Sequence, residues 1–320
     1  MKKDQVKAGK TIQQQTGRTF HLATRLLPKR IRHATYVLYG FFRIADEIVD
    51  DPDGPAPDEQ AAQLADLRAE ALGRQPTDEP VLAAFVDLCE EHDIDDEWVL
   101  EFLDAMESDI DTDRYETYED LEDYMRGSAA AVGVMMTDIM DLDDEEYERA
   151  LPHAIKLGEA FQLTNFIRDV REDVIDRERV YLPIETLERH GVDRDQVMRL
   201  ESSEEFRAAV EEELRRTEEL YREGVAGIRF LPEDCQFAVL LAAVLYAEHH
   251  RGIRAVDYDT ITHEPDLSTA RKLLLVAKTR WHWLWNKDPE AVFHRVSAVP
   301  AGEATHHEHG RGWMRWLPTR

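Results

Sequence analysis

Residues 162–173 read QLTNFIRDVRED, a segment in which apolar side chains are interleaved with ionisable ones. A helix repeats every 3.6 residues, so side chains three or four positions apart share a face. Over residues 154–176, one stripe is small or polar and includes Asn165, Asp169 and Asp173, whereas apolar side chains cover most of the remainder. The pattern predicts a helix whose acidic stripe faces the interior of the protein.

A second helix with two distinct faces is predicted over residues 35–50, TYVLYGFFRIADEIVD. One stripe is apolar, and another at the same spacing carries Tyr39, Arg43, Asp46 and Asp50. The two aspartates lie one turn, about 6 Å, apart on the same side of the helix. The segment DPDGP that follows then ends the helix, because proline cannot continue it.

Acids that face inward require compensation, since burying an unpaired carboxylate is strongly unfavourable. A divalent cation shared by the two acidic stripes would supply it, and Mg²⁺ is usually held by carboxylates together with substrate phosphates. The sequence therefore predicts a cage for Mg²⁺ and a diphosphate. A pair of buried, salt-bridged helices, with Arg43 against Asp173 for instance, is the alternative. Asp109 and Asp113 repeat the spacing in a polar, turn-like context and are interpreted as solvated surface.

The composition excludes some classes of function. The 320 residues include 67 acidic and 39 basic side chains, a formal charge of −28 that would repel nucleic acid. Acid enrichment with 43% hydrophobic residues suggests a halophilic protein in a salt-rich cytoplasm. Two cysteines give no disulfide framework or zinc cluster, and the start, MKKDQVKAGK, lacks the apolar core of a signal peptide. A cytoplasmic protein is expected.

Helical periodicity dominates the chain, so a single all-α domain is predicted over residues 1–297. The apolar run 237–247 is too short to span a bilayer and is interpreted as a buried helix. Breaks between helices are expected at 51–58, 73–80, 182–195 and 231–234. Residues 298–320 are predicted to form a mobile tail. Five of the six tryptophans lie at or beyond position 281, which suggests peripheral membrane contact; docking of these tryptophans on the helical body is the alternative.

Four motifs in order carry a resemblance to a known family. They are RTFHLATRLLP (18–28), YGFFRIADEIVDD (39–51), YMRGSAAAVGVMM (124–136) and QLTNFIRDVREDVIDRERVYLP (162–183). The chain resembles the squalene/phytoene synthase family of head-to-head prenyl transferases over nearly its whole length. The first motif departs from the family, which usually shows Ser-x-Ser-Phe, because residues 17–20 keep a single hydroxyl, that of Thr19.

The resemblance implies an isoprenoid synthase-type helical bundle around a central apolar channel. It implies that Mg²⁺, or Mn²⁺ in its place, and the diphosphates are held by Asp46, Asp50, Asn165, Asp169 and Asp173. Diphosphate contacts are implied for Thr19, Arg43, Arg168, Arg179 and Tyr246. Tyr124 is expected near the reacting carbons, where its ring would stabilise a carbocation and its hydroxyl would assist proton loss.

The implied reaction joins two geranylgeranyl diphosphates to phytoene through a cyclopropylcarbinyl diphosphate, as a step of carotenoid biosynthesis beside other enzymes of that pathway. QLTN (162–165) and GSAAAVG (127–133) are more similar to phytoene synthases than to squalene synthases. The alternative is a squalene synthase, which joins two farnesyl diphosphates and uses NADPH. A chain-elongating prenyl transferase fits less well, because its first motif normally opens with two adjacent aspartates and Asp46 precedes Glu47. From another class, a non-catalytic acidic helical scaffold is the distant alternative.

Overall fold

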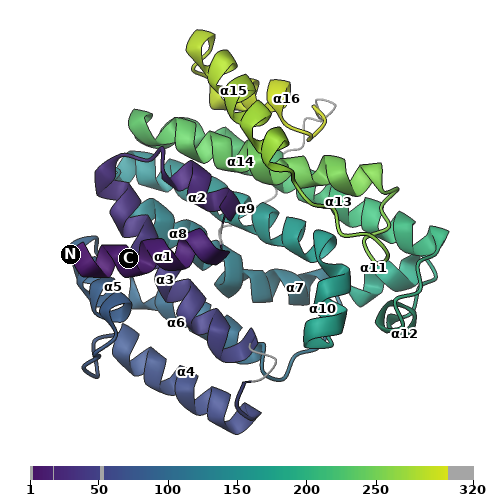
Figure 1. The fold of residues 1–320 in the computed structure, drawn as a ribbon, viewed down its shortest axis with the longest axis horizontal. Coiled ribbons are helices and arrows are strands. Elements are labelled where there is room, and N and C mark those ends of the chain that lie inside the picture. Colours follow the sequence, from purple (N-terminus) through teal and green to yellow (C-terminus); the bar gives the residue numbers. More distant parts are fainter. Residues whose placement is uncertain (1–2, 17, 51–53, 302–320) are drawn as a thin grey trace.

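The computed structural model describes residues 3–16, 18–50 and 54–301, and within these ranges the side chains of 8–14, 20–50 and 54–301. The described residues form helices, and the isolated bridge between Arg114 and Val180 is their only β-type pairing (Figure 1). The all-α prediction is confirmed. The helices are α1 Lys3–Thr16, α2 Arg18–Thr24, α3 Lys29–Asp50, α4 Pro57–Ala71, α5 Pro80–Glu91, α6 Asp96–Ser108, α7 Tyr118–Met125, η1 Arg126–Ala130, α8 Ala131–Asp138, α9 Asp144–Arg168, α10 Val170–Arg177, α11 Ile184–Arg189, α12 Arg194–Met198, α13 Glu204–Ala226, η2 Gly227–Phe230, α14 Glu233–Ala255, α15 Thr269–Trp285 and α16 Pro289–Val296.

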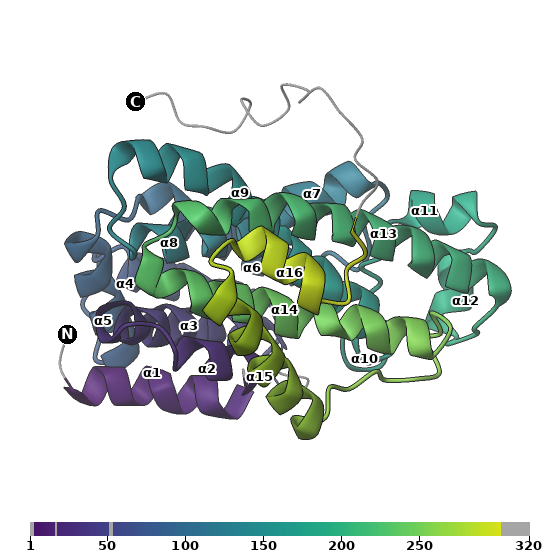
Figure 2. The same ribbon diagram turned by 90° about the horizontal axis from the view of Figure 1, so that it is seen from above.

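Long helices run through the middle of the molecule. Helix α9 packs along α13 and against α14, η1 and α8, while α3 packs against α1, α5 and α6. Helices α15 and α16 lie on the outer side of α14 (Figure 2). The end of α3 and the short helix α10 lie at the same end of the bundle (Figure 1). This arrangement brings together two segments that are more than a hundred residues apart in the sequence.

The predicted helix boundaries agree with the structure in part. The acidic stripe of 35–50 lies in α3, and residues 237–247 lie in α14 as expected. The stretch 154–176 is not one helix, because Asp169 leaves the helical conformation (φ −99°, ψ 16°) and separates α9 from α10. The connection expected at 182–195 contains the short helix α11 and the start of α12. These errors concern where helices break, which tertiary contacts decide.

Small residues let the central helices approach closely. A Cβ added at Gly158 of α9 would lie 2.6 Å from the carbonyl oxygen of Ala129, and one at Gly133 of α8 would lie 2.6 Å from that of Ala154. Both distances are shorter than any carbon–oxygen contact allows, so only glycine fits. The small residues of the sequence GSAAAVG therefore hold η1 and α8 against α9. The five residues of η1 form a π-helical turn directly after Met125, a distortion that often occurs at functional sites.

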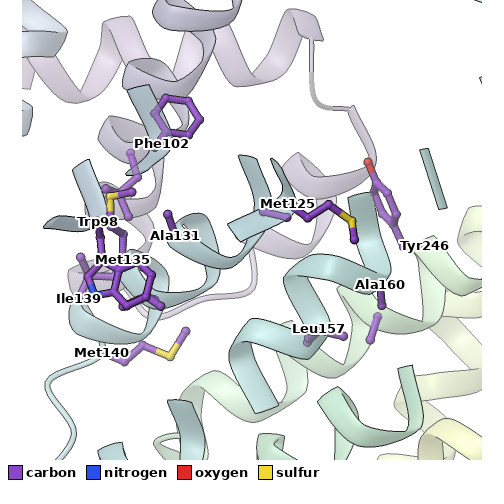
Figure 3. Packing of buried hydrophobic residues seen from close by; sticks show 14 of the residues in the cluster. Trp98, Phe102, Met125, Ala131, Met135, Ile139, Met140, Leu157, Ala160 and Tyr246 are labelled. Carbon is purple, nitrogen blue, oxygen red and sulfur yellow. The ribbon is translucent and has the colours of Figure 1, made fainter. Parts of the chain in front are cut away.

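The core is one large apolar cluster with a smaller one beside α10 and α11. Within the large cluster, Met125 points toward Tyr246, while Trp98, Met135 and Ile139 group together at a distance from them (Figure 3). Val299, which lies beyond the predicted domain boundary, is buried in the same cluster. Of the predicted tail, 298–320, the structure describes residues 298–301, and residues 302–320 lie outside the described part of the chain. Among the described helices, none combines the length and the apolar character needed to cross a bilayer.

Candidate active site

The two predicted acidic motifs meet at one end of the bundle. Asp46 and Asp50 occupy the last turns of α3, and Asp169 and Asp173 lie at the α9–α10 junction and in the first turn of α10. Arg177, one turn further along α10, joins them. Its Nη2 lies 3.0 Å from Asp50 Oδ2, and its Nη1 lies 2.8 Å from Asp173 Oδ1.

The structure thus contains a salt bridge between the two acidic segments, but through a different cation from the one considered in the sequence. Arg43 does not pair with Asp173; it lies 3.7 Å from Asp46 and 3.6 Å from Glu47, both on its own helix. Arg177 was not singled out, although its i,i+4 spacing from Asp173 was visible in the sequence.

Burial makes this group of carboxylates electrostatically costly. Burial, and secondarily repulsion from Asp50, raises the pKa of Asp46 to about 7, although its side chain keeps 36% of its surface open to solvent. Burial likewise raises the pKa of Asp173 to about 7, against the opposing effect of Arg177. Asp46, Asp50, Asp169 and Asp173, which we call the acidic rim, thus place several carboxylates close together at a partly exposed end of the bundle. A cation beside these carboxylates would favour their ionised form and lower their pKa values.

At the same site, one buried polar atom of Asn165 lacks a hydrogen-bond partner among the described residues. Its amide nitrogen donates to Gln162 Oε1 at 3.4 Å, but its buried Oδ1 accepts no hydrogen bond from the described residues. A buried acceptor without a partner is unfavourable, so it indicates a missing water or cation. Carboxylate and amide oxygens are hard donors, which Mg²⁺ and Mn²⁺ prefer. The donor set therefore fits such an ion by its chemistry.

The positions of the side chains do not yet form a closed metal cage. Among the described residues, no three Asp, Glu, His or Cys side chains converge closely enough to hold a metal ion. Arginines hold the carboxylates instead: Arg177 contacts Asp50 and Asp173, and Arg168 contacts both oxygens of Asp169, with its Nε 2.6 Å from Oδ1. Ion binding would require these guanidinium groups to give way.

A second polar cluster lies buried beside the acidic rim, and it contains Tyr124 of α7. The Tyr124 hydroxyl donates to Asp109 Oδ2 at 2.8 Å, and Arg179 Nη1 donates to Asp109 Oδ1 at 2.7 Å. The same Arg179 nitrogen donates to the Tyr181 hydroxyl at 2.5 Å. Aromatic rings of Tyr115, Tyr181 and Phe166 surround Tyr124.

The interpretation of Asp109 as solvated surface is wrong. Its relative exposure is 7%, and burial raises its pKa to about 6 despite the nearby Arg179. The reason is a long-range pairing that local sequence does not encode. The backbone N–H of Val180 donates to the carbonyl of Asp113, and that of Ile184 to Tyr115, so the chain after α10 runs beside the chain after α6. Asp113, by contrast, is exposed and pairs with Arg194.

The remaining predicted contacts lie on either side of these two clusters. Arg179 is buried next to Tyr124, not at the acidic rim. Tyr246 of α14 is buried; its ring stacks on Phe20 at 4.4 Å and lies 5.0 Å from Phe161. Burial raises the pKa of the Tyr246 hydroxyl. The backbone of Thr19 belongs to α2, and its side chain lies outside the described part.

The helical bundle and its acidic rim define an enzyme of the α-helical isoprenoid synthase class. A family model described as squalene/phytoene synthase matches residues 13–274. The chain belongs to the squalene/phytoene synthase family.

Named relatives agree with this assignment. The chain is 33% identical over 264 residues to the phytoene synthase of Rhodobacter capsulatus, and the matched region covers 82% of this chain and 76% of that one. It is 30% identical over 270 residues to the 15-cis-phytoene synthase of Synechocystis, which covers 81% and 80% respectively. A dehydrosqualene synthase solved with a ligand superposes with a TM-score of 0.78 at 28% identity, over 88% of this chain and 98% of that one.

Proposed function

We propose that this enzyme is a 15-cis-phytoene synthase, which condenses two geranylgeranyl diphosphates to phytoene for carotenoid biosynthesis. The observation that carries the proposal is the similarity over four fifths of the chain to relatives named phytoene synthase or 15-cis-phytoene synthase. Each turnover releases two diphosphates, and the joined carbon skeleton loses two protons: one when the cyclopropylcarbinyl diphosphate forms and one when the final cation becomes the triene. The alternative is a squalene-type reaction on farnesyl diphosphate, which the dehydrosqualene and squalene synthase structures among its neighbours favour. Membership of an enzyme family removes the support for a non-catalytic scaffold.

The acidic rim is the proposed diphosphate site. Mg²⁺, or Mn²⁺, would be held there by Asp46, Asp50, Asn165, Asp169 and Asp173. When bound, the ion supplies positive charge that stabilises the departing diphosphate. The orphaned Asn165 Oδ1 and the raised pKa values of Asp46 and Asp173 support this assignment.

Arginines of the rim would bind the phosphates directly. Arg168 and Arg43 are half-buried and lie beside Asp169 and Asp46. A guanidinium that exchanges a carboxylate for a phosphate keeps a charge-assisted, two-pronged hydrogen bond, so such an exchange is inexpensive. Thr19 and Tyr246 would contribute hydroxyl contacts from α2 and α14. For Arg179, burial beside Tyr124 supports a place near the reacting carbons.

The carbocations would form next to Tyr124, among the aromatic rings that surround it. The faces of these rings stabilise positive charge, and their packing excludes water that would quench it. The isoprenoid tails require an apolar channel. We place its walls at partly buried apolar side chains that pack on the core and still have accessible surface. These are Phe20, Phe42, Val132, Met136 and Phe161.

The product assay tests the function. Purified enzyme with Mg²⁺ should convert geranylgeranyl diphosphate to phytoene without NADPH, and EDTA should abolish diphosphate release. Product formation from farnesyl diphosphate, with none from geranylgeranyl diphosphate, would instead establish the squalene-type reaction. Because the charge of −28 destabilises the fold when it is not screened, the assay belongs in molar salt.

The cellular setting is proposed from the same features. The acid excess favours the cytoplasm of a halophile, where high salt screens the self-repulsion. The product is a hydrocarbon that water does not dissolve, so peripheral contact with a membrane and with other carotenoid-pathway enzymes is proposed for its transfer. Activity and native circular dichroism that persist after dialysis into dilute buffer would contradict the halophilic assignment.

A further inference from the structure

We infer that the outer face of α15 is a docking surface for an anionic lipid bilayer. The inference deepens the proposed function, because it names the surface through which an insoluble product would leave. Seven large apolar side chains are exposed in the described part of the chain, and α15 alone contributes five of them. These are Leu273 (61% exposed), Leu274 (54%), Trp281 (61%), Leu284 (55%) and Trp285 (78%).

The five side chains form one continuous stripe. Counted from Leu273 as zero, they lie at positions 0, 1, 8, 11 and 12 along the helix. At 3.6 residues per turn, these positions share a face about a third of the circumference wide. The opposite face buries Leu275, Thr279 and Trp283 against the body of the protein. The helix is thus apolar on both faces, and only one of them is covered. Figure 2 shows α15 on the outside of α14, where its outer face is accessible.

The charge of this segment is opposite in sign to the net charge of the protein. Residues 269–287 contain five Lys or Arg side chains and no Asp or Glu, in a chain where acids outnumber bases by 67 to 39. Lys278 borders the stripe on one side and Arg280 on the other. An apolar stripe flanked by cations complements a bilayer with anionic headgroups.

Tryptophan content favours lipid over a second protein chain. The indole rings of Trp281 and Trp285 lie edge to face with their centroids 6.1 Å apart, at the exposed end of the helix. Indoles partition to the boundary between headgroups and acyl chains. A stable dimer usually buries about 800 Å² on each partner. The stripe is only one helix wide, so it is a small surface for a dimer interface.

The docking face is one helix away from the active site. Trp283 packs on Phe237 of α14, and Arg271 pairs with Glu248 of the same helix at 2.8 Å. Tyr246 on α14 lies two residues from Glu248 and belongs to the predicted substrate site. A bilayer seated on α15 therefore lies next to the wall of the proposed channel, where a hydrocarbon could pass from protein to lipid.

Vesicle flotation of the full chain tests the inference without measuring the reaction. At the lowest salt concentration at which circular dichroism shows the native fold, wild-type protein should float with phosphatidylglycerol vesicles and bind phosphatidylcholine vesicles several-fold more weakly. Trp281→Gln/Trp285→Gln should weaken partitioning by at least about tenfold. Lys278→Glu should also reduce binding to anionic vesicles, while Arg215→Glu, an exposed position on α13, should not. Phytoene formation from detergent-solubilised substrate should remain at the wild-type level in all variants.

Three outcomes would overturn the inference. Full flotation of the double tryptophan variant would place the lipid contact elsewhere. A dimer in sedimentation velocity that this variant abolishes, with no flotation of the wild type, would make a second copy the occupant. If the wild type neither floats nor forms such a dimer, the remaining candidate to cover this face is the segment 302–320, which contains Trp313 and Trp316. Failure of the phytoene assay alone would refute the proposed function and leave the flotation result unaffected.

The geometry of the buried cluster points independently to Asp109 as a positioning residue for Tyr124. One oxygen of its carboxylate accepts a hydrogen bond from the Tyr124 hydroxyl, and the other accepts one from Arg179. The hydroxyl hydrogen is thereby turned away from the reacting carbons, and the oxygen lone pairs and the electron-rich ring remain for the cation. This role rests on the proposed function, since it acts through Tyr124.

A double-mutant cycle separates positioning from general structural support. Asp109→Asn should lower kcat by about tenfold or more and change KM for geranylgeranyl diphosphate less than twofold, with partial recovery in Asp109→Glu. In a Tyr124→Phe background, which keeps the ring and the Asp109–Arg179 pair, Asp109→Asn should have little further effect. An equal loss of kcat in both backgrounds would overturn the assignment. Diphosphate release by the Tyr124→Phe variant from either substrate shows separately whether the proposed reaction class holds.

Discussion

The salt bridge between the acidic motifs leads to a prediction about Arg177. Replacing it with alanine leaves Asp50 and Asp173 facing each other without their shared cation. Their side chains are 23% and 9% exposed, and that of Arg177 is 25% exposed, so the site lies between surface and interior. Breaking a buried pair costs 3–5 kcal/mol and an exposed pair 0–1 kcal/mol. We expect Arg177→Ala to lower the free energy of unfolding by about 2 kcal/mol in the absence of divalent ions.

The consequence for metal binding has the opposite sign. In the wild type a divalent ion must displace the guanidinium from both carboxylates, whereas in the variant it meets no competitor. Binding to the folded state alone raises stability by linkage. We expect Mg²⁺ to raise the melting temperature of Arg177→Ala more than that of the wild type, by about 3 °C, so that it offsets most of the destabilisation.

Differential scanning fluorimetry with EDTA or with Mg²⁺, at constant high ionic strength, measures both effects. Arg171→Ala is the matched control, because Arg171 lies on the same helix but its side chain contacts no described residue of the acidic motifs; it pairs with Glu264 at 3.6 Å and donates to the carbonyl of Ile261 at 3.1 Å. It should shift the melting temperature by less than about 1 °C. Equal Mg²⁺ responses of the wild type and Arg177→Ala would refute the view that Arg177 occupies the place of the ion.

Three further predictions follow from single contacts. Gly158→Ala should destabilise the protein by about 1–3 kcal/mol, because its Cβ would meet a carbonyl oxygen at 2.6 Å; thermal unfolding measures this. Burial lowers the pKa of His249 to about 3, so the neutral imidazole stabilises the folded state fully above pH 6.5, and this stabilisation is lost as the pH falls toward 3. The drop in melting temperature between about pH 7.5 and pH 5 should therefore be smaller in His249→Gln than in the wild type. Asp169→Asn should reduce phytoene formation at least a hundredfold, whereas Asp113→Asn, which alters an exposed ion pair, should keep most of the activity.

The sequence predicted those features that depend on local spacing. The amphipathic pattern of 35–50 placed Asp46 and Asp50 on one face of α3, and the family resemblance predicted the bundle and the reaction class. The continuous helix over 154–176 was a wrong extrapolation, since the same periodicity continues on both sides of Asp169. A one-residue departure from helical geometry leaves no periodic signal, yet it determines the direction in which α10 leaves α9.

Asp109 could not be recovered from spacing because acids are too common in this chain. With 67 Asp and Glu in 320 residues, the DxxxD pattern occurs on solvated surface and in the site alike. What separates Asp109 from Asp113 is the segment that follows α10. It lies beside residues 113–116, and its Arg179 pairs with the buried Asp109, whereas Asp113 stays exposed. A contact between segments seventy residues apart has no counterpart in a local pattern.

The arginines would have been more informative than the aspartates. A buried guanidinium must pair with a carboxylate or an equivalent acceptor, because it cannot lose its proton. Arg168, Arg177 and Arg179 lie inside the second acidic motif, within a span of twelve residues. Arg168 pairs with Asp169, Arg177 with both Asp50 and Asp173, and Arg179 with Asp109. These three arginines thus lie where buried or half-buried carboxylates have to be balanced. On α15, Arg271 pairs with Glu248 of α14, whereas Lys278 and Arg280 border the exposed apolar stripe, where we propose that anionic headgroups balance their charge.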